Sequence, residues 1–196
     1  MPAAALCARC GIPRPPSFTT CAACVARPPA FDVARAVGLY LAEGIQLNPL
    51  ARAVRALKFR GHRAVAATLG EAMAHVLPGG PHDLVMPVPL HVARLRERGY
   101  NQAVLLARAL ARAARLPLVP DGLVRRRSTP SQADLDASAR RMNVRGAFVV
   151  SRRIDGAAVV LVDDVLTTGA TADACARALR EGGARHVSVL TVGRTP

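Results

Sequence analysis

The chain has 196 residues, of which 51% are hydrophobic and 20% charged, so it can bury a core. This composition excludes a disordered or fibrous protein. No apolar run approaches the roughly 18 residues that a membrane span needs, so we expect no membrane insertion. The first residues lack the basic and apolar regions of a secretory signal. We therefore expect a soluble, cytoplasmic protein with one ordinary domain and a small appendage.

The charge is strongly positive, because 27 Lys and Arg residues against 13 Asp and Glu residues give a net charge of +14. A field of this sign attracts polyanions such as nucleic acid, phosphorylated metabolites or anionic lipid. The alternative is a compositional bias toward Ala, Arg, Gly and Pro along the whole chain, and charge alone does not decide between the two. Aromatic residues make up only 3%, which argues against an extended base-stacking platform.

Four of the five cysteines form two CxxC pairs near the start of the chain, Cys7 with Cys10 and Cys21 with Cys24. In an intracellular protein two such pairs favour a metal over a disulfide, because together they complete a tetrahedral shell of thiolates. Gly11 follows the first pair, where the turn needs a residue tolerant of positive φ. We predict a structural zinc ion, whose binding energy folds this short segment. A redox dithiol pair or an empty site is the alternative.

Beyond about Phe31 the composition becomes globular, so we predict a zinc module at residues 1–30 and a larger domain at residues 31–196. The larger domain alternates between helical and strand-like segments, which predicts a mostly parallel sheet flanked by helices. Helical patterns cover residues 48–61, 62–77, 100–115 and 171–180, and strand-like runs cover residues 83–86, 157–162 and 186–192. In such folds a ligand lies beyond the carboxyl ends of the strands.

Residues 159–171, with the sequence VVLVDDVLTTGAT, form the most informative segment. An apolar run ends at two adjacent acids, Asp163 and Asp164, and a loop of small residues then leads into a helix. Threonine hydroxyls, the close backbone approach at Gly169 and the amides of a helix start suit a monophosphate, while two carboxylates suit a sugar diol. No Gly-Lys-Ser/Thr follows, so this is not a Walker A loop. The alternative is an ordinary strand-to-helix turn.

This segment resembles the phosphoribosyl pyrophosphate (PRPP) motif of type I phosphoribosyltransferases, whose pattern of four apolar residues, two acids and seven small or apolar residues it matches throughout. The resemblance implies the α/β fold of that family and PRPP bound together with Mg²⁺. It implies that Asp163 and Asp164 bind the ribose hydroxyls and act in catalysis. It assigns the 5-phosphate to Val165, Leu166, Thr167, Thr168, Gly169, Ala170 and Thr171.

A longer series of motifs is similar to the ComF family, which is associated with natural competence and the handling of incoming single-stranded DNA. The similarity runs nearly from end to end, so it does not depend on one short motif. After the paired cysteines the series comprises residues 58–61, 87–90 and 94–102, then Thr129, Gln132, Arg140, Arg141, Asn143 and residues 146–148, and finally the PRPP motif.

Two of these motifs suggest a pyrophosphate site. By resemblance, Pro87 and Val88 occupy the place of the family's pyrophosphate loop, although the prolines could simply end a strand. Arg94 and Arg98 are four residues apart, so on a helix they share a face and could clamp a phosphate group together with Lys58. A solvated arginine face is the alternative for these two arginines.

The next two motifs suggest contacts to a base and a mobile cover. Tyr100, Asn101 and Gln102 combine a ring with two amides, which suits a nucleobase or a DNA base, but they could equally cap the following helix. Residues 121–150 are rich in arginine and by resemblance form a hood that closes over the substrate, with a plain basic loop as the alternative.

Three functions follow from these observations, the weakest of which is a regulator whose zinc ribbon docks another protein while PRPP reports purine or pyrimidine supply. In the first, the protein is a phosphoribosyltransferase in which the C1–pyrophosphate bond of PRPP breaks and a nucleobase or related nucleophile captures C1. In the second, it is a non-catalytic module of the competence machinery that binds single-stranded DNA or a helicase partner. The PRPP site would then serve for sensing or for gripping a terminal 5′-phosphate. The sequence identifies neither a general base nor an acceptor.

Overall fold

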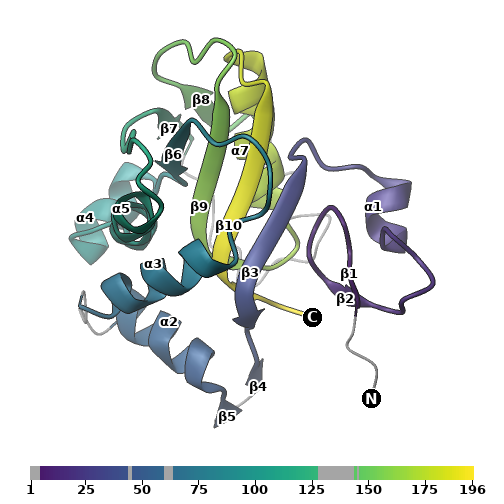
Figure 1. Ribbon diagram of the computed structural model, residues 1–196. Coiled ribbons are helices and arrows are strands. Elements are labelled where there is room, and N and C mark those ends of the chain that lie inside the picture. Colours follow the sequence, from purple (N-terminus) through teal and green to yellow (C-terminus); the bar gives the residue numbers. More distant parts are fainter. Residues whose placement is uncertain (1–4, 44–45, 60–63, 128–143, 145) are drawn as a thin grey trace.

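The computed structural model describes residues 5–43, 46–59, 64–127, 144 and 146–196. It confirms the predicted α/β class, because a four-stranded parallel sheet lies between helices (Figure 1). The strand order is β3 (Val33–Leu39), β10 (His186–Arg194), β9 (Ala158–Leu166) and β6 (Leu84–Pro87). In the part of the chain that the structure describes, no helix is long and apolar enough to cross a membrane.

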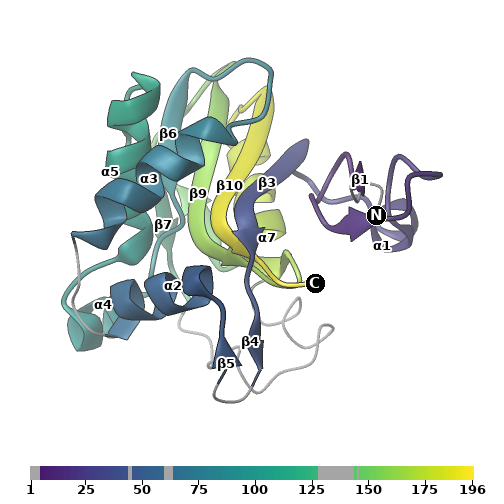
Figure 2. The ribbon, with the colours of Figure 1, turned by 60° about the horizontal axis from the view of Figure 1, so that its bottom comes forward.

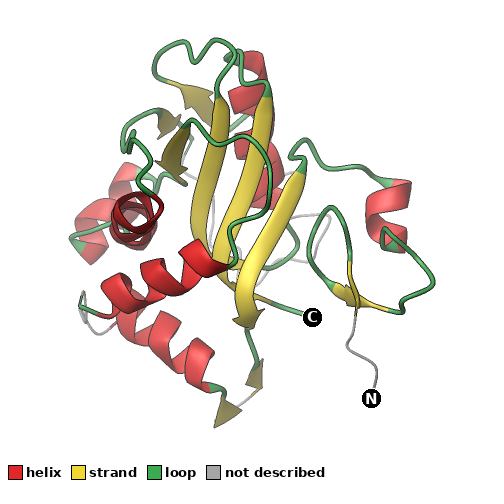
Figure 3. Cartoon of the chain, viewed as in Figure 1, coloured by secondary structure: helices red, strands yellow, loops and turns green. Residues whose placement is uncertain are grey.

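Helices cover both faces of this sheet, which gives three layers (Figures 2 and 3). On one face lie α2 (Pro49–Phe59), α3 (Val65–His75) and α5 (Gln102–Ala114), and on the other lies α7 (Ala170–Glu181). Each face of the sheet packs into its own hydrophobic core, and alternate residues of β9 point into the two cores. Val160 and Val162 pack on the side of α2, α3 and α5, and Val159 and Leu161 pack on the side of α7. The continuous apolar run in the sequence is explained by this burial on both faces.

The helices α2 and α5 each begin at an asparagine whose side chain caps the helix. Asn48 precedes α2, and its Oδ1 accepts a hydrogen bond from the Ala51 amide at 2.8 Å, with Pro49 at the first helical position. Asn101 precedes α5, and its Oδ1 accepts from the Ala103 amide at 2.9 Å. These side chains satisfy amides that the helices themselves cannot pair.

The predicted end of the strand at residue 162 is wrong. β9 continues through both acids to Leu166, because β10 pairs with it as far as the register position Arg194–Leu166. A strand was expected to end at the first charged residue, but the backbone ladder pairs amides and carbonyls whatever the side chain. The acids therefore lie inside the strand rather than beyond it.

Several elements carry no clear hydrophobic pattern and were not predicted. The edge strand β3 is one of them, since Arg35 and Gly38 interrupt its apolar residues. The others are the pairs β1 (Ala5–Leu6) with β2 (Pro13–Arg14), β4 (Ala42–Glu43) with β5 (Gln46–Leu47) and β7 (Leu123–Arg125) with β8 (Phe148–Val150), and the helices α1 (Ala22–Ala26) and α4 (Val92–Arg98).

The four-cysteine segment covers the outer edge of the sheet (Figure 1). The amide of Ala34 in β3 donates to the carbonyl of Arg9 at 2.5 Å, so this edge of β3 is paired at that point. Gly11 has the predicted positive φ of 68°, and a Cβ there would lie 2.6 Å from the Ala34 carbonyl oxygen. A free edge strand invites pairing with other chains, and this contact removes that exposure.

Candidate phosphoribosyl and four-cysteine sites

A cavity of about 310 Å³ lies where β9 ends and α7 begins. This is the end of the sheet at which parallel α/β folds bind their ligands. The predicted motif supplies most of its walls, and α2 and the segment after β3 supply the rest. The lining residues are Tyr40, Lys58, Asp163, Val165, Leu166, Thr167, Gly169, Ala170, Thr171 and Ala172.

The loop between β9 and α7 has the geometry of an anion site. Gly169 adopts the left-handed conformation, with φ 79° and ψ 0°, and turns the chain into α7. The Thr168 hydroxyl accepts a hydrogen bond from the Ala170 amide at 3.4 Å, and Thr167 and Thr168 are both exposed. The start of a helix carries partial positive charge and unpaired amides, so hydroxyls and amides converge here on one region.

The two acids of the motif point to different places. Asp163 lines the cavity, and its Oδ1 accepts from the Asp164 amide at 2.8 Å. Asp164 is only 4% exposed, and its Oδ2 lies 2.8 Å from Lys58 Nζ and accepts from Gln102 Nε2 at 3.0 Å. Adjacent residues of a strand face opposite sides of a sheet, so only Asp163 is turned to the cavity while α2 and α5 hold Asp164.

These surroundings give the cavity acid an unusual charge balance. Loss of hydration on burial, together with the negative charge of Asp164, raises the pKa of Asp163 to about 7. For Lys58, burial lowers the pKa, but the carboxylates of Asp164 and Asp163 more than offset this and the net shift is upward. Lys58 therefore carries its charge at neutral pH, and a cation or hydrogen-bond donors beside Asp163 would favour its ionised form.

The residues predicted to hold pyrophosphate are only partly brought together. Lys58 lies in the cavity wall, but its charge is paired with Asp164. Arg98 reaches the same network, because its Nη1 donates to Gln102 Oε1 at 2.9 Å. Arg94 instead pairs with Glu97 at 3.1 Å on the exposed surface of α4.

The remaining part of that prediction concerns the end of β6 and the residue that follows it. Pro87 and Val88 are buried, and the Val88 amide donates to the Val162 carbonyl at 2.8 Å. This bond continues the parallel pairing with β9 beyond the end of β6. The segment therefore runs beside the motif strand without lining the cavity.

The residues predicted to contact a base have partners within the chain. The Tyr100 hydroxyl donates to the carbonyl of Leu57. Asn101 caps α5, as its alternative interpretation predicted, and its Nδ2 donates to the Val88 carbonyl at 3.0 Å. Gln102 binds Asp164 as described above. These bonds tie the start of α5 to α2, to the residue after β6 and to β9, and a role at a base stays a prediction.

Several predicted residues lie outside the described part of the chain. In the hood segment the structure describes residues 121–127, 144 and 146–150, which include the β7–β8 pair. The undescribed residues of the ComF-like series are Arg60, Gly61, Thr129, Gln132, Arg140, Arg141 and Asn143.

Two residues of the cavity wall, Tyr40 and Ala172, were missed by sequence reasoning; Ala172 directly follows the predicted motif. Tyr40 directly follows β3 and belongs to none of the motifs. The available signal was indirect: a tyrosine at the end of a strand, in a chain with only two tyrosines. Recognising it required β3, which was itself not predicted.

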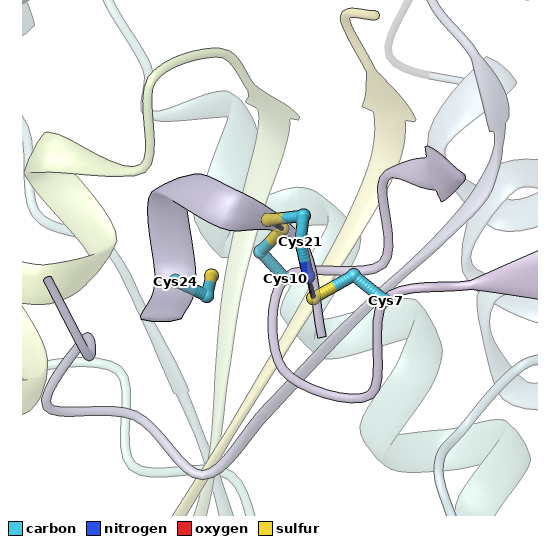
Figure 4. A group of neighbouring side chains, drawn as sticks. All are labelled: Cys7, Cys10, Cys21 and Cys24. Carbon is cyan, nitrogen blue, oxygen red and sulfur yellow. Dashed lines mark hydrogen bonds between the residues drawn. The ribbon is translucent and has the colours of Figure 1, made fainter. Parts of the chain in front are cut away.

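The four predicted cysteines come together at the start of the chain (Figure 4). Cys7 and Cys10 lie on the turn after β1, and Cys21 and Cys24 lie at the start of α1. Their sulfur atoms all lie within 4.8 Å of one another, and those of Cys10 and Cys21 are 3.7 Å apart. A tetrahedral zinc site with Zn–S bonds of about 2.3 Å separates its sulfur atoms by about 3.8 Å, so the cluster fits a zinc ion.

The surroundings also favour the thiolate form at one of these positions. Burial raises the pKa of the Cys7 thiol, but hydrogen bonds from backbone amides, Cys21 first among them, bring it down to about 6. The amide of Cys21 donates to Cys7 Sγ at 3.3 Å. Since the thiolate is the form that binds a metal, these amides prepare the site.

The chain is similar to known proteins over both its four-cysteine part and its larger domain. A family model described as the phosphoribosyl transferase domain matches residues 100–195. The DNA utilization protein YhgH of Escherichia coli O157:H7 is 32% identical over 201 residues, covering 97% of this chain and 84% of the relative. Competence protein F of Haemophilus influenzae is 30% identical over 198 residues, covering 96% and 84%. Competence protein ComFC of Bacillus subtilis is 33% identical over 143 residues, covering 70% and 57%.

Among solved structures, the chain is similar to glutamine phosphoribosylpyrophosphate amidotransferase from B. subtilis, with 26% identity and a TM-score of 0.46. The match covers 65% of this chain and 26% of the amidotransferase chain, so this chain spans about a quarter of that protein.

Asparagine at the two acidic positions is expected to change stability in opposite directions. A carboxyl with a raised pKa binds more protons when folded, so stability falls as the pH rises from 3.8 through about 7. Asp163→Asn removes this cost and should raise the unfolding free energy at pH 8 by about 1–3 kcal/mol, with no gain below pH 4. Asp164→Asn leaves Lys58 without its charged partner, so the unfolding free energy should fall by about 2–3 kcal/mol. Urea unfolding at pH 4 and pH 8 measures both, and a destabilising Asp163→Asn at pH 8 would contradict the assignment.

Removing one cysteine of the cluster is expected to abolish metal binding. Cys21→Ala leaves three thiolates, and the zinc content of the purified protein should fall from about one ion per chain to none. Cys175→Ala is the matched control, because Cys175 is buried in α7, outside the cluster, and its loss should leave the zinc content unchanged. Elemental analysis measures both variants. Equal zinc content in Cys21→Ala and the unaltered protein would rule out a four-thiolate site.

Proposed function

Because the chain belongs to the ComF family and carries a phosphoribosyl transferase domain, we propose that it binds PRPP with Mg²⁺ in the cavity between β9 and α7. The observation that carries this proposal is the placement of Asp163 and the Thr167–Thr171 loop around one cavity. The end of the cavity formed by the Thr167–Thr171 loop suits an anion, and the end formed by Asp163 suits hydroxyl donors or a cation.

The anionic end would take the 5-phosphate. The hydroxyls of Thr167, Thr168 and Thr171 and the amides at the start of α7 would donate to its oxygens, and Gly169 leaves room for it because nothing lies within 4 Å of the position its Cβ would have. The helix dipole adds a favourable field for a dianion.

The acidic end would take the ribose. Asp163 would accept hydrogen bonds from the ribose hydroxyls and stabilise positive charge that develops on the sugar. Because the site offers carboxylate and hydroxyl oxygens, it fits Mg²⁺, which prefers hard oxygen ligands and keeps several waters. When bound, Mg²⁺ would neutralise pyrophosphate charge. Asp164 would act from the other face of β9, by holding Lys58 in the cavity wall.

The proposed reaction class is phosphoribosyl transfer. The bond between C1 and the pyrophosphate oxygen would break, the electron pair would leave with pyrophosphate, and a nitrogen nucleophile would form the new bond to C1. Lys58, Pro87, Val88, Arg94 and Arg98 remain the proposed pyrophosphate contacts. For Arg94 this would require that its pair with Glu97 opens. The proposed compartment is the cytoplasm, where PRPP would be available.

Isothermal titration with PRPP and Mg²⁺ tests the proposal. Asp163→Asn should weaken binding by about 10- to 100-fold, since one hydrogen bond to a charged group is worth about 1.5–3 kcal/mol. Replacing both Asp163 and Asp164 by alanine should abolish binding. Asp155→Asn is the matched control, because Asp155 is exposed, pairs with Arg153 and does not line the cavity. PRPP affinity that is absent in the unaltered protein, or unchanged in both variants, would refute the PRPP site.

A second candidate function is binding of single-stranded DNA by the four-cysteine module. The observation that favours it is Phe18, which is 63% exposed on the module, where Val25 and Arg27 are exposed as well. An exposed ring can stack on a base, and arginines can contact phosphates. The relatives named for competence and DNA utilization are consistent with such a role. In this function the PRPP site would serve for sensing or for a terminal 5′-phosphate.

Salt dependence distinguishes this second function from chance association. If about four phosphates are neutralised, affinity for an oligonucleotide should fall about 50-fold between 50 and 200 mM salt. Phe18→Ala should weaken binding further at every salt concentration, whereas Leu95→Ala, at an exposed position of α4, should not. Fluorescence anisotropy measures both. An affinity that hardly changes with salt would exclude the basic surface as the contact.

A further inference from the structure

The cavity holds one aromatic side chain among its described lining residues, that of Tyr40. The chain has no Trp, four Phe and two Tyr, so an aromatic residue at a polar cavity is an uncommon placement for this sequence. Tyr40 is partly exposed and follows the last residue of β3, Leu39. Its amide donates to the Arg194 carbonyl at 2.8 Å, so the backbone here still follows β10.

The direction of the Tyr40 side chain is set by a glycine on the neighbouring strand. A Cβ at Gly193 would lie 2.8 Å from Tyr40 Cβ and 3.2 Å from Tyr40 Cδ2. The side chain therefore occupies the space that any side chain at position 193 would fill. Gly193 is in register with Val165 of β9, which also lines the cavity. The absence of a side chain on β10 thus lets the ring reach across toward β9.

The surroundings of the ring suit a flat, uncharged group. Lys58 also lines the cavity, and its charge is neutralised by the carboxylate of Asp164, whose Oδ2 lies 2.8 Å from Lys58 Nζ. Hydroxyls and helix amides that would hold an anion come from the loop after β9. The cavity thus has an anion-binding loop, an acid and an aromatic wall, and its volume of about 310 Å³ falls in the range of small-ligand sites.

We propose that Tyr40 is the surface on which the planar heterocyclic base of the acceptor or product nucleotide stacks. This inference rests on the proposed function, because it assumes that the loop and Asp163 hold the phosphate and the ribose. It makes Tyr40 a specificity residue: it selects ligands that carry a flat ring on C1, and it contributes little to the phosphoribosyl part. The stacking face does not depend on the hydroxyl, so phenylalanine should replace tyrosine.

Titration of the full-length, zinc-loaded protein with two kinds of probe tests this assignment. The probes are ribose 5-phosphate and the four nucleoside 5′-monophosphates that contain adenine, guanine, uracil or cytosine, each with Mg²⁺. In the unaltered protein at least one nucleotide should bind about tenfold more tightly than ribose 5-phosphate, the size expected for one stacked base. Tyr40→Phe should keep this preference.

Tyr40→Leu keeps an apolar side chain but removes the aromatic face, so the nucleotide should bind no more than about twofold better than ribose 5-phosphate. The affinity for ribose 5-phosphate itself should not change. Leu41→Ala is the matched control, because Leu41 is the next residue, is exposed and does not line the cavity. If Tyr40→Leu does not fold, the comparison of nucleotides with ribose 5-phosphate in the unaltered protein still tests the assignment.

The outcomes separate the two proposals. If neither PRPP nor ribose 5-phosphate binds the unaltered protein, the proposed function is refuted and the assignment of Tyr40 goes with it. If ribose 5-phosphate binds but no nucleotide binds more tightly, or if Tyr40→Leu keeps the tenfold preference, the assignment of Tyr40 is refuted and the phosphoribosyl site stands.

Discussion

The buried carboxylate of Asp164 is the point at which three elements of the fold meet. It belongs to β9, pairs with Lys58 of α2 at 2.8 Å and accepts a hydrogen bond from Gln102 of α5 at 3.0 Å. A carboxylate that is 4% exposed must be paired, because an unpaired buried charge costs several kcal/mol, about 3–5 by analogy with broken buried ion pairs. The packing of α2 and α5 on the sheet and the charge state of the motif therefore depend on the same contact.

Asp163 can face a ligand because its neighbour carries the structural contacts. Asp163 and Asp164 are both aspartates of β9, but the pleat of the strand turns their side chains to opposite faces of the sheet. Lys58 is thereby committed to Asp164, and burial beside that second negative charge raises the pKa of Asp163 to about 7. Because its surroundings disfavour the ionised form of Asp163, a ligand that supplies a cation or hydroxyl donors would stabilise that form. This is the common exchange of stability for function at a binding site.

The four-cysteine module contacts α7, the helix that begins at the end of the Thr167–Gly169 loop. The amide of Ala30 donates to Asp173 Oδ1 in the first turn of α7 at 2.6 Å, and Arg180 Nε near the end of α7 donates to the Ala30 carbonyl at 3.5 Å. On its other side the module pairs with β3 through Arg9 and Ala34. The module thus contacts both the edge strand β3 and α7, and none of its described residues lines the cavity.

The sequence by itself determined the features that depend on residues close together in the chain. The CxxC spacing, the apolar run of β9, the loop of small residues and the start of α7 are local, because adjacent backbone groups and side chains create each of them. The acids, the threonines, Gly169 and the paired cysteines could therefore be named in advance. The edge strand β3 could not, since its stability comes from pairing with β10 and from the cover of the four-cysteine module.

Only the tertiary structure decided which partner each functional side chain has. That Asp164 is held by Lys58 and Gln102, from positions 106 and 62 residues away in the chain, follows from how α2 and α5 pack, as does the bond from Tyr100 to Leu57. The place of Tyr40 in the cavity wall depends on Gly193 in another strand. Such contacts join residues that are distant in sequence, and their choice depends on packing and register that no local pattern encodes.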